Sequence, residues 1–313
     1  MANNSVDISS APARRPKLGI ALGSGSARGW AHIGILQELE TMGYKPDVVV
    51  GTSIGALVGA VYVSGVMEEF AHWVSHLSFR DVLGFLDIGF SGGVVKGEKL
   101  FNFFSEHQSN PLIEELAIPF ATVATDMTSG REVWIRDGHV LDAARASCAL
   151  PGLFSPVQYQ DKWMLDGGLV NPVPVSVCRA LGADVVVAVN LNGQLVGRHL
   201  NSAAIEEVNT VDIPQGEDNE NEISMWDRVK DYFSNKDEPT SPGLFDVIGS
   251  SINIMQDRIT RSRMAGDPPE INLVPMLADF ALMDFHRAKE AIEEGRRLVR
   301  AAEESLRWLL HEA

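Results

Sequence analysis

The sequence predicts an α/β fold in which a mainly parallel central sheet is covered by helices on both faces. Short runs of β-branched and aliphatic residues recur along the chain, and such near-continuous apolar runs are typical of buried strands. Between several of them lie longer segments whose apolar residues recur every three or four positions, which is typical of helices packed on a sheet. The expected strands of the sheet lie at 18–22, 48–50, 120–125, 183–190 and 271–274.

Length and composition are those of a globular protein with a sizeable core. The chain has 313 residues, of which 45% are hydrophobic and 22% are charged. We expect one domain from residue 17 to 313, preceded by a flexible tail over residues 1–16. The stretch from about 192 to 243 is rich in Asp, Glu, Asn, Ser and Pro, and we interpret it as an acidic, flexible insertion.

The net charge and the cysteine content limit which partners the protein can bind and indicate the cellular compartment in which it works. The formal net charge of −16 argues against a nucleic-acid partner, because no surplus of basic side chains neutralises phosphates. The two cysteines, Cys148 and Cys178, do not make a disulfide framework, which indicates a reducing compartment. We expect a cytoplasmic protein without a signal peptide, in contact at most peripherally with the inner face of a membrane. Residues 48–67 carry no charge, but glycines and serines dilute their hydrophobicity, so we expect no transmembrane segment.

The first expected strand, 18–22, runs into a glycine-rich loop at 23–29, and a helix follows. Such a loop is a cradle for an anion. A dinucleotide fingerprint fits poorly because Gly29 comes one position late, and a P-loop is excluded because no Gly-Lys-Ser/Thr follows. The backbone N–H groups from about Ser24 to Ala27 fit the oxyanion of an acyl-transfer transition state better. Close packing of strand against helix, without any ligand, is the structural alternative.

The stretch 45–60 has the pattern of a strand, a sharp turn and a helix. Its turn, Gly51-Thr52-Ser53-Ile54-Gly55, matches G-x-S-x-G, in which the serine lies on a tight strand-to-helix turn. Backbone N–H groups and the helix dipole at this position favour a developing negative charge. Ser53 is therefore the candidate nucleophile, and a glycine-rich turn without function is the alternative.

A carboxylate follows another expected strand. An expected hairpin over 157–165 leads directly into Asp166-Gly167-Gly168, where the glycines allow a neighbouring segment to approach closely. An ordinary aspartate in a turn is the alternative. The histidines after Asp166 lie in the acidic insertion or in the terminal helix: His199, His286 and His311. Their positions favour a dyad in which Asp166 contacts Ser53 directly, and we expect His32 to be packed.

Two further segments carry weaker signals. The stretch 83–93 combines apolar bulk with glycines, and we interpret it either as a lid over an acyl-chain pocket or as ordinary core. Near the end of the chain, apolar residues from 285 to 309 recur at threes and fours. This spacing predicts one long amphipathic helix.

The three motifs, in this order, resemble those of bacterial patatin-like phospholipases, in the group that also contains the neuropathy target esterase domain. The resemblance covers about residues 17–190, with Asn171-Pro172-Val173-Pro174 following the third motif, and it returns over the final strand and helix. It implies a three-layer α/β/α patatin-like fold. It also implies a serine acyl hydrolase, a lipase or esterase that cleaves fatty acyl esters of phospholipids or lysophospholipids through an acyl-enzyme.

Carried over to this chain, the resemblance implies a Ser53–Asp166 dyad and an oxyanion hole of backbone N–H groups from Gly25 and Ser26. The residues adjacent to this hole are Ser24 and Ala27. Relatives often have glycine at the positions of Ser24 and Ser26, and backbone donors survive that difference unless the loop needs a positive φ there. The supporting motif residues are Gly23, Arg28, Gly29, Gly51, Gly55, Gly167 and Gly168. The resemblance requires no cofactor and no metal.

Two other classes of function compete with this interpretation. A non-catalytic regulator or scaffold with the same fold would bind partners through the acidic insertion. A nucleotide-binding protein would use the loop at 23–29, although the position of Gly29 weakens that hypothesis.

Overall fold

The computed structural model describes residues 14–85, 110–194 and 244–311. Most of the acidic insertion, of the expected tail and of the expected lid lies outside the described residues. At the end of the expected tail, Arg14 pairs with Asp184 and Arg15 with Asp47, at 2.8 and 2.7 Å.

Within the described residues, eight strands form one mixed sheet. Seven of them follow the order β5-β6-β3-β2-β1-β7-β8, and β4 pairs with β3. The strands are β1 (Leu18–Leu22), β2 (Val48–Thr52), β3 (Phe120–Asp126), β4 (Glu132–Ile135), β5 (Val157–Tyr159), β6 (Lys162–Asp166), β7 (Val185–Val189) and β8 (Ile271–Leu273). The strands predicted from apolar runs are therefore confirmed.

The pairing of the strands determines where the loops gather. Neighbours along β3-β2-β1-β7-β8 are parallel, whereas β4 and β6 are antiparallel to β3. The segments that follow β1, β2 and β7 therefore leave the sheet at the same edge, where open α/β sheets place their ligands.

The helices cover both faces of the sheet, as the sequence predicts. The α-helices are α1 (Ala31–Thr41), α2 (Ile54–Val63), α3 (Met67–Val74), α4 (Phe79–Phe85), α6 (Val140–Ser147), α7 (Val175–Ala180), α9 (Leu244–Gly266), α10 (Ala288–Ala301) and α11 (Glu303–His311). Short 3₁₀ segments are η1 (Ser26–Trp30), η2 (Ile113–Glu115), η3 (Gly167–Leu169) and η5 (Phe285–Arg287).

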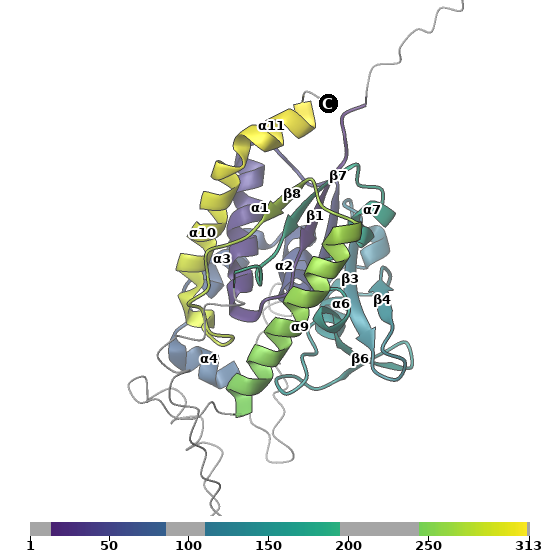
Figure 1. The fold of residues 1–313 in the computed structure, drawn as a ribbon, viewed down its shortest axis with the longest axis vertical. Helices are drawn as coiled ribbons and strands as arrows, with labels where there is room; N and C mark the ends of the chain where they lie inside the picture. The colour runs from purple at the N-terminus through teal and green to yellow at the C-terminus, as the bar shows by residue number, and fades with distance from the viewer. Residues whose placement is uncertain (1–13, 86–109, 195–243, 312–313) are drawn as a thin grey trace, which may run out of the picture.

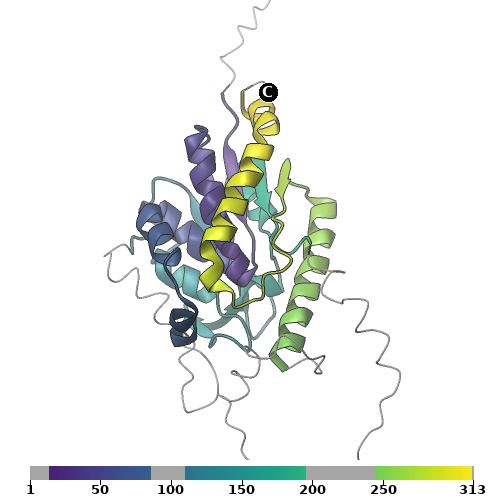
Figure 2. The ribbon, with the colours of Figure 1, turned by 90° about the vertical axis from the view of Figure 1, so that its left-hand side faces the viewer.

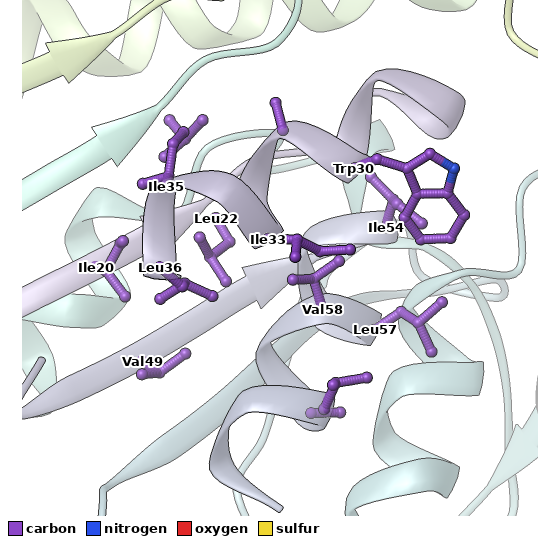
Figure 3. Close-up of a cluster of buried hydrophobic side chains, with 14 of the residues drawn as sticks. Ile20, Leu22, Trp30, Ile33, Ile35, Leu36, Val49, Ile54, Leu57 and Val58 are labelled. Carbon is purple, nitrogen blue, oxygen red and sulfur yellow. The ribbon is translucent and has the colours of Figure 1, made fainter. Parts of the chain in front are cut away.

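Two hydrophobic clusters lie on opposite faces of the sheet. The larger one contains alternate residues of β1, such as Ile20 and Leu22, packed against α1, α2 and α10. Figure 3 shows its centre, where Ile33 and Leu36 of α1 lie over Val49 and Val58. The smaller cluster joins the other residues of β1, β2 and β7 to α7. The fold is thus the three-layer α/β/α arrangement that the sequence predicts.

Two regions of the C-terminal part differ in how well the sequence predicts them. Helical spacing of apolar residues over about 244–264 predicts a helix there. Helix α9 covers this range and runs alongside the sheet, apart from the layer of α1 and α10 (Figures 1 and 2). The single long helix expected at the end is instead broken at Ala302, where φ is −96° and ψ is 3°. The same apolar spacing continues into α11, so periodicity alone did not reveal the break.

Candidate active site

Ser53 lies at the turn between β2 and α2, where it is the N-cap residue of the helix. Its backbone has φ 56° and ψ −127°, a strained conformation for a residue with a side chain. Two glycines make the turn possible. A Cβ on Gly51 would meet the carbonyl oxygen of Gly55, and a Cβ on Gly55 would meet the carbonyl oxygen of Leu22. Each glycine of the G-x-S-x-G pattern is therefore required because a neighbouring backbone lies where a side chain would be.

A second serine holds the strained turn. The backbone N–H of Ser53 donates to Oγ of Ser147 at 2.8 Å, and that hydroxyl donates to the carbonyl oxygen of Val123 at 2.5 Å. Ser147 is the last residue of α6 and is fully buried. Sequence reasoning missed it, because a serine at a helix end carries no motif.

The register of the sheet brings Asp166 beside Ser53. Thr52, the residue before Ser53, pairs with Val123 of β3, and the next residue of β3, Ala124, pairs with Asp166. Ser53, the candidate nucleophile, and the carboxylate of Asp166 are therefore level with each other on either side of β3. A Cβ on Gly167 would meet the carbonyl oxygen of Val123, so this turn also requires glycine.

The two side chains contact each other directly. Oγ of Ser53 donates to Oδ2 of Asp166 at 2.5 Å, and the backbone N–H of Gly168 donates to Oδ1 at 2.7 Å. Asp166 has no exposed surface. Burial raises the pKa of this carboxyl to about 6, against the opposing effect of these two hydrogen bonds. The carboxylate is a stronger base than an exposed aspartate.

None of the histidines placed by the structure hydrogen-bonds to this pair. Nε2 of the fully buried His32 donates to the carbonyl oxygen of Gly23 at 2.8 Å. Burial lowers the pKa of His32 to about 4, so the ring is neutral and packed, as expected. His286 in η5 lies edge-on to Phe79, and His199 lies outside the described residues.

The glycine-rich loop presents two free backbone donors. The N–H of Ser24 donates to the carbonyl oxygen of Pro172 at 2.8 Å, and that of Ala27 to the carbonyl oxygen of Leu282 at 3.2 Å. The N–H groups of Gly25 and Ser26 have no acceptor among the described residues. Of the four candidate donors, these two are available to an oxyanion.

Ser26 has a positive φ, the conformation in which a serine in place of glycine is strained. Its φ is 51°, in the left-handed region that glycine occupies without strain. Its hydroxyl donates to the carbonyl oxygen of Leu282 at 2.6 Å, which helps to hold the loop in place. A glycine at this position would adopt the same φ without strain.

Arg28 is a buried support of the loop, with 1% of its surface exposed. Its Nε donates to the carbonyl oxygen of Gly25 at 3.2 Å, and burial lowers its pKa to about 10. No carboxylate among the described residues pairs with it. Close contacts surround the other loop glycines, since a Cβ on Gly23 would meet the carbonyl oxygen of Val189 and one on Gly29 would meet Ile54.

A cavity of about 440 Å³ lies near Asp166, although neither Asp166 nor Ser53 is among its lining residues. Its lining includes Cys148 and Ala149, which directly follow Ser147, and the carbonyl oxygen of Ala149 accepts the N–H of Asp166 at 2.9 Å. Burial and the nearby charge of Asp166 raise the pKa of the Cys148 thiol, so this thiol is not a competing nucleophile.

Two other kinds of feature are absent from the described part of the chain. No group of three or more His, Cys, Asp or Glu side chains there could hold a metal ion. No helix there is long and apolar enough to cross a membrane.

Comparison with known proteins agrees with the motifs. A family model described as patatin-like phospholipase matches residues 20–179. An uncharacterised NTE family protein of Mycobacterium tuberculosis is 32% identical over 331 aligned residues, which cover 93% of this chain and 92% of the relative. The lysophospholipase NTE1 of Pyricularia oryzae is 26% identical over 89% of this chain but only 18% of its own length.

A solved structure is a more distant match. VipD from Legionella pneumophila has 14% sequence identity and a TM-score of 0.38, over 96% of this chain and 77% of VipD. The family model and the mycobacterial relative, together with the three motifs in their order, show that the chain belongs to the patatin-like phospholipase family.

Proposed function

We propose that the protein is a serine acyl hydrolase that cleaves fatty acyl esters of lysophospholipids or phospholipids. The family itself supports hydrolysis of lipid esters, and a fungal relative is named a lysophospholipase. The observation that carries the proposal is the 2.5 Å hydrogen bond from Ser53 Oγ to the buried carboxylate of Asp166.

In the first half of the reaction, Asp166 takes the proton of Ser53 while Oγ attacks the ester carbonyl carbon. The N–H groups of Gly25 and Ser26 donate to the oxyanion that forms. The tetrahedral intermediate then collapses, and Asp166 returns the proton to the alcohol oxygen that leaves. An acyl-enzyme on Ser53 remains.

In the second half, Asp166 takes a proton from water, and the resulting hydroxide attacks the acyl carbon. Collapse releases the fatty acid and returns the proton to Ser53. A base works best when its pKa lies near the working pH, and the pKa of about 6 for Asp166 suits this role. The dipole of α2 favours the negative charge that develops at Ser53.

The cavity beside Asp166 is the proposed site for part of the substrate. Its lining is mixed, with Phe154, Pro156 and Val157 as apolar members and Arg145, Gln158 and Gln160 as polar members. Such a lining accepts a molecule with both an apolar and a polar part, as a lysophospholipid has.

Profiling of hydrolysis tests this proposal. Wild-type protein is offered lysophospholipids, diacyl phospholipids and soluble short-chain esters, and Ser53→Ala is compared with Ser129→Ala. Ser129 lies exposed on the turn after β3 and is the matched control. We expect fatty acid release by the wild type and by Ser129→Ala, and none above background by Ser53→Ala. If the wild type hydrolyses no ester, a non-catalytic role is favoured instead.

Peripheral contact with the inner face of a membrane stays a prediction of this function, because the substrate resides in lipid. Co-sedimentation of the protein with phospholipid vesicles tests it, and protein that stays in the supernatant at every lipid concentration contradicts it.

A further inference from the structure

The oxyanion loop is connected to a helix that lies far from it in the sequence and outside the matched family segment. Three buried or half-buried amides form this connection: Asn192, just after β7, and Asn253 and Gln256 on α9. None of the motifs includes them, and the reaction described above does not use them.

Gln256 holds the beginning of the loop. Its Oε1 accepts a hydrogen bond from Oγ of Ser24 at 2.9 Å and another from Nδ2 of Asn192 at 2.7 Å. Only 4% of Gln256 is exposed, and Ser24 and Asn192 are each 1% exposed. Without Gln256, the hydroxyl of Ser24 and the amide of Asn192 would each lose a hydrogen-bond acceptor while buried, which lowers the stability of this arrangement.

The same side chain also touches the turn of the catalytic carboxylate. A Cβ on Gly168 would meet Nε2 of Gln256, so the amide lies directly against the backbone that donates to Asp166. Gln256 therefore fills the space between the loop that follows β1 and the turn that follows β6.

Asn253, one turn earlier on α9, holds the end of the loop through Arg28. Nη2 of Arg28 donates to Oδ1 of Asn253 at 3.1 Å and to Oδ1 of Asn192 at 3.2 Å. The same guanidinium donates from Nε to the carbonyl oxygen of Gly25 at 3.2 Å. That carbonyl belongs to the peptide whose N–H is the free donor of Ser26.

The two free donors, the N–H groups of Gly25 and Ser26, thus lie between Ser24 and Arg28 in the loop. Ser24 and Arg28 each donate a hydrogen bond to a side chain of α9. We propose that α9 sets the geometry of the oxyanion hole, with Gln256 as the main positioning residue and Asn253 as the second. This inference rests on the proposed function, since a hole that binds no oxyanion needs no such alignment.

The strained backbone at Ser26 explains why such a support is needed. A serine with a φ of 51° keeps that conformation only while its surroundings hold it. A displacement of about 1 Å in a catalytic group costs about 100-fold in rate. Release of the Ser24 end of the loop would therefore lower the rate of the chemical step more than it weakens substrate binding.

The first test replaces Gln256 with methionine, which has a similar length and volume but accepts no comparable hydrogen bond. With a soluble short-chain ester, we expect Gln256→Met to lower kcat by about 10- to 100-fold and to change KM by less than about twofold. Ile254→Ala is the control, because Ile254 lies on the same helix and is 50% exposed. Thermal unfolding of both variants shows whether the fold is intact.

A double-mutant cycle separates positioning from general damage. If Ser24 and Gln256 act through their hydrogen bond, Ser24→Ala lowers kcat in the wild type but has little further effect in Gln256→Met. Equal effects of Ser24→Ala in both backgrounds would overturn the proposal. So would wild-type kcat in a folded Gln256→Met protein.

Asn253→Ala provides a test that does not depend on the folding of Gln256→Met, because Asn253 is only half-buried. We expect a loss of several-fold in kcat with an unchanged KM, since Arg28 keeps one of its two amide acceptors. A change in KM alone would contradict the positioning role. Failure of the wild type to hydrolyse any ester would instead contradict the proposed function.

Discussion

Helices α2 and α9 both reach the candidate active site, but α2 buries only apolar residues and glycine, whereas α9 also buries polar side chains. Every residue of α2 from Ile54 to Val61 is buried, and all are apolar or glycine. On α9 the buried residues include Ile252 and three polar residues, Gln256, Asp257 and Thr260, which are 4%, 2% and 2% exposed, whereas Ile254 and Met255 are about half exposed, at 50% and 48%. The comparison shows that α2 fixes one backbone turn by packing, whereas α9 contributes side-chain hydrogen bonds.

The difference has consequences for how each helix tolerates change. At Gly55 of α2, the backbone of Leu22 and Gly23 approaches so closely that a single methyl group has no space. At Gly249 of α9, the nearest neighbour is the end of the Leu282 side chain, which can move. Substitutions should therefore damage the fold when they fall at α2 and the chemistry when they fall on the inner face of α9.

The largest effect is expected from Asp166→Asn, beside the N-terminus of α2. The amide keeps the shape but is not a base, so kcat should fall by about 1,000-fold or more. Steady-state hydrolysis of a soluble ester measures this effect. A loss of less than about tenfold would contradict the role of Asp166 as base.

The same variant also tests the cost of the buried charge. Because burial raises the pKa of Asp166 to about 6, the stability that its neutral form contributes is full below pH 4 and is lost as the pH rises through 6. The melting temperature of Asp166→Asn relative to wild type should therefore be higher at pH 8 than at pH 5. The reverse order would mean that the carboxylate stabilises the fold.

A pair of glycine substitutions compares the two helices directly. In Gly55→Ala the new methyl meets backbone atoms of Leu22 and Gly23, whereas in Gly249→Ala on α9 it meets the side chain of Leu282. We expect Gly55→Ala to lower the free energy of unfolding by about 3 kcal/mol, the upper range for overpacking. Gly249→Ala should stay within about 1 kcal/mol, because alanine also favours the helix. Denaturant unfolding measures both, and equal losses would contradict the comparison.

The pH profile gives the smallest of these effects. If Asp166 must be ionised, kcat/KM should rise with pH, reach half its maximum near pH 6 and be about tenfold below the plateau at pH 5. Circular dichroism over the same range checks that the fold persists. Half-maximal activity near pH 4 would indicate a carboxyl with an ordinary pKa.

The sequence predicted the parts of this site that depend on backbone geometry. Glycines beside Ser53 and Asp166 are visible in the sequence because close backbone approach leaves no other residue. The contributions of Ser147 and Gln256 could not be predicted, because they depend on tertiary contacts between segments 94 and 232 residues apart. A polar residue within a helix usually lies on the solvated face. On α9 this rule would place Gln256 in solvent, whereas Gln256 is buried.

Labelling with a fluorophosphonate, followed by mass spectrometry of the peptides, is the sharpest test of the Ser53–Asp166 dyad, because the probe reacts with an activated serine. We expect modification of Ser53 in the wild type, none in Ser53→Ala, and much slower labelling in Asp166→Asn, where the base is absent. Modification of a different serine, or labelling of Asp166→Asn at the wild-type rate, would contradict the Ser53–Asp166 dyad.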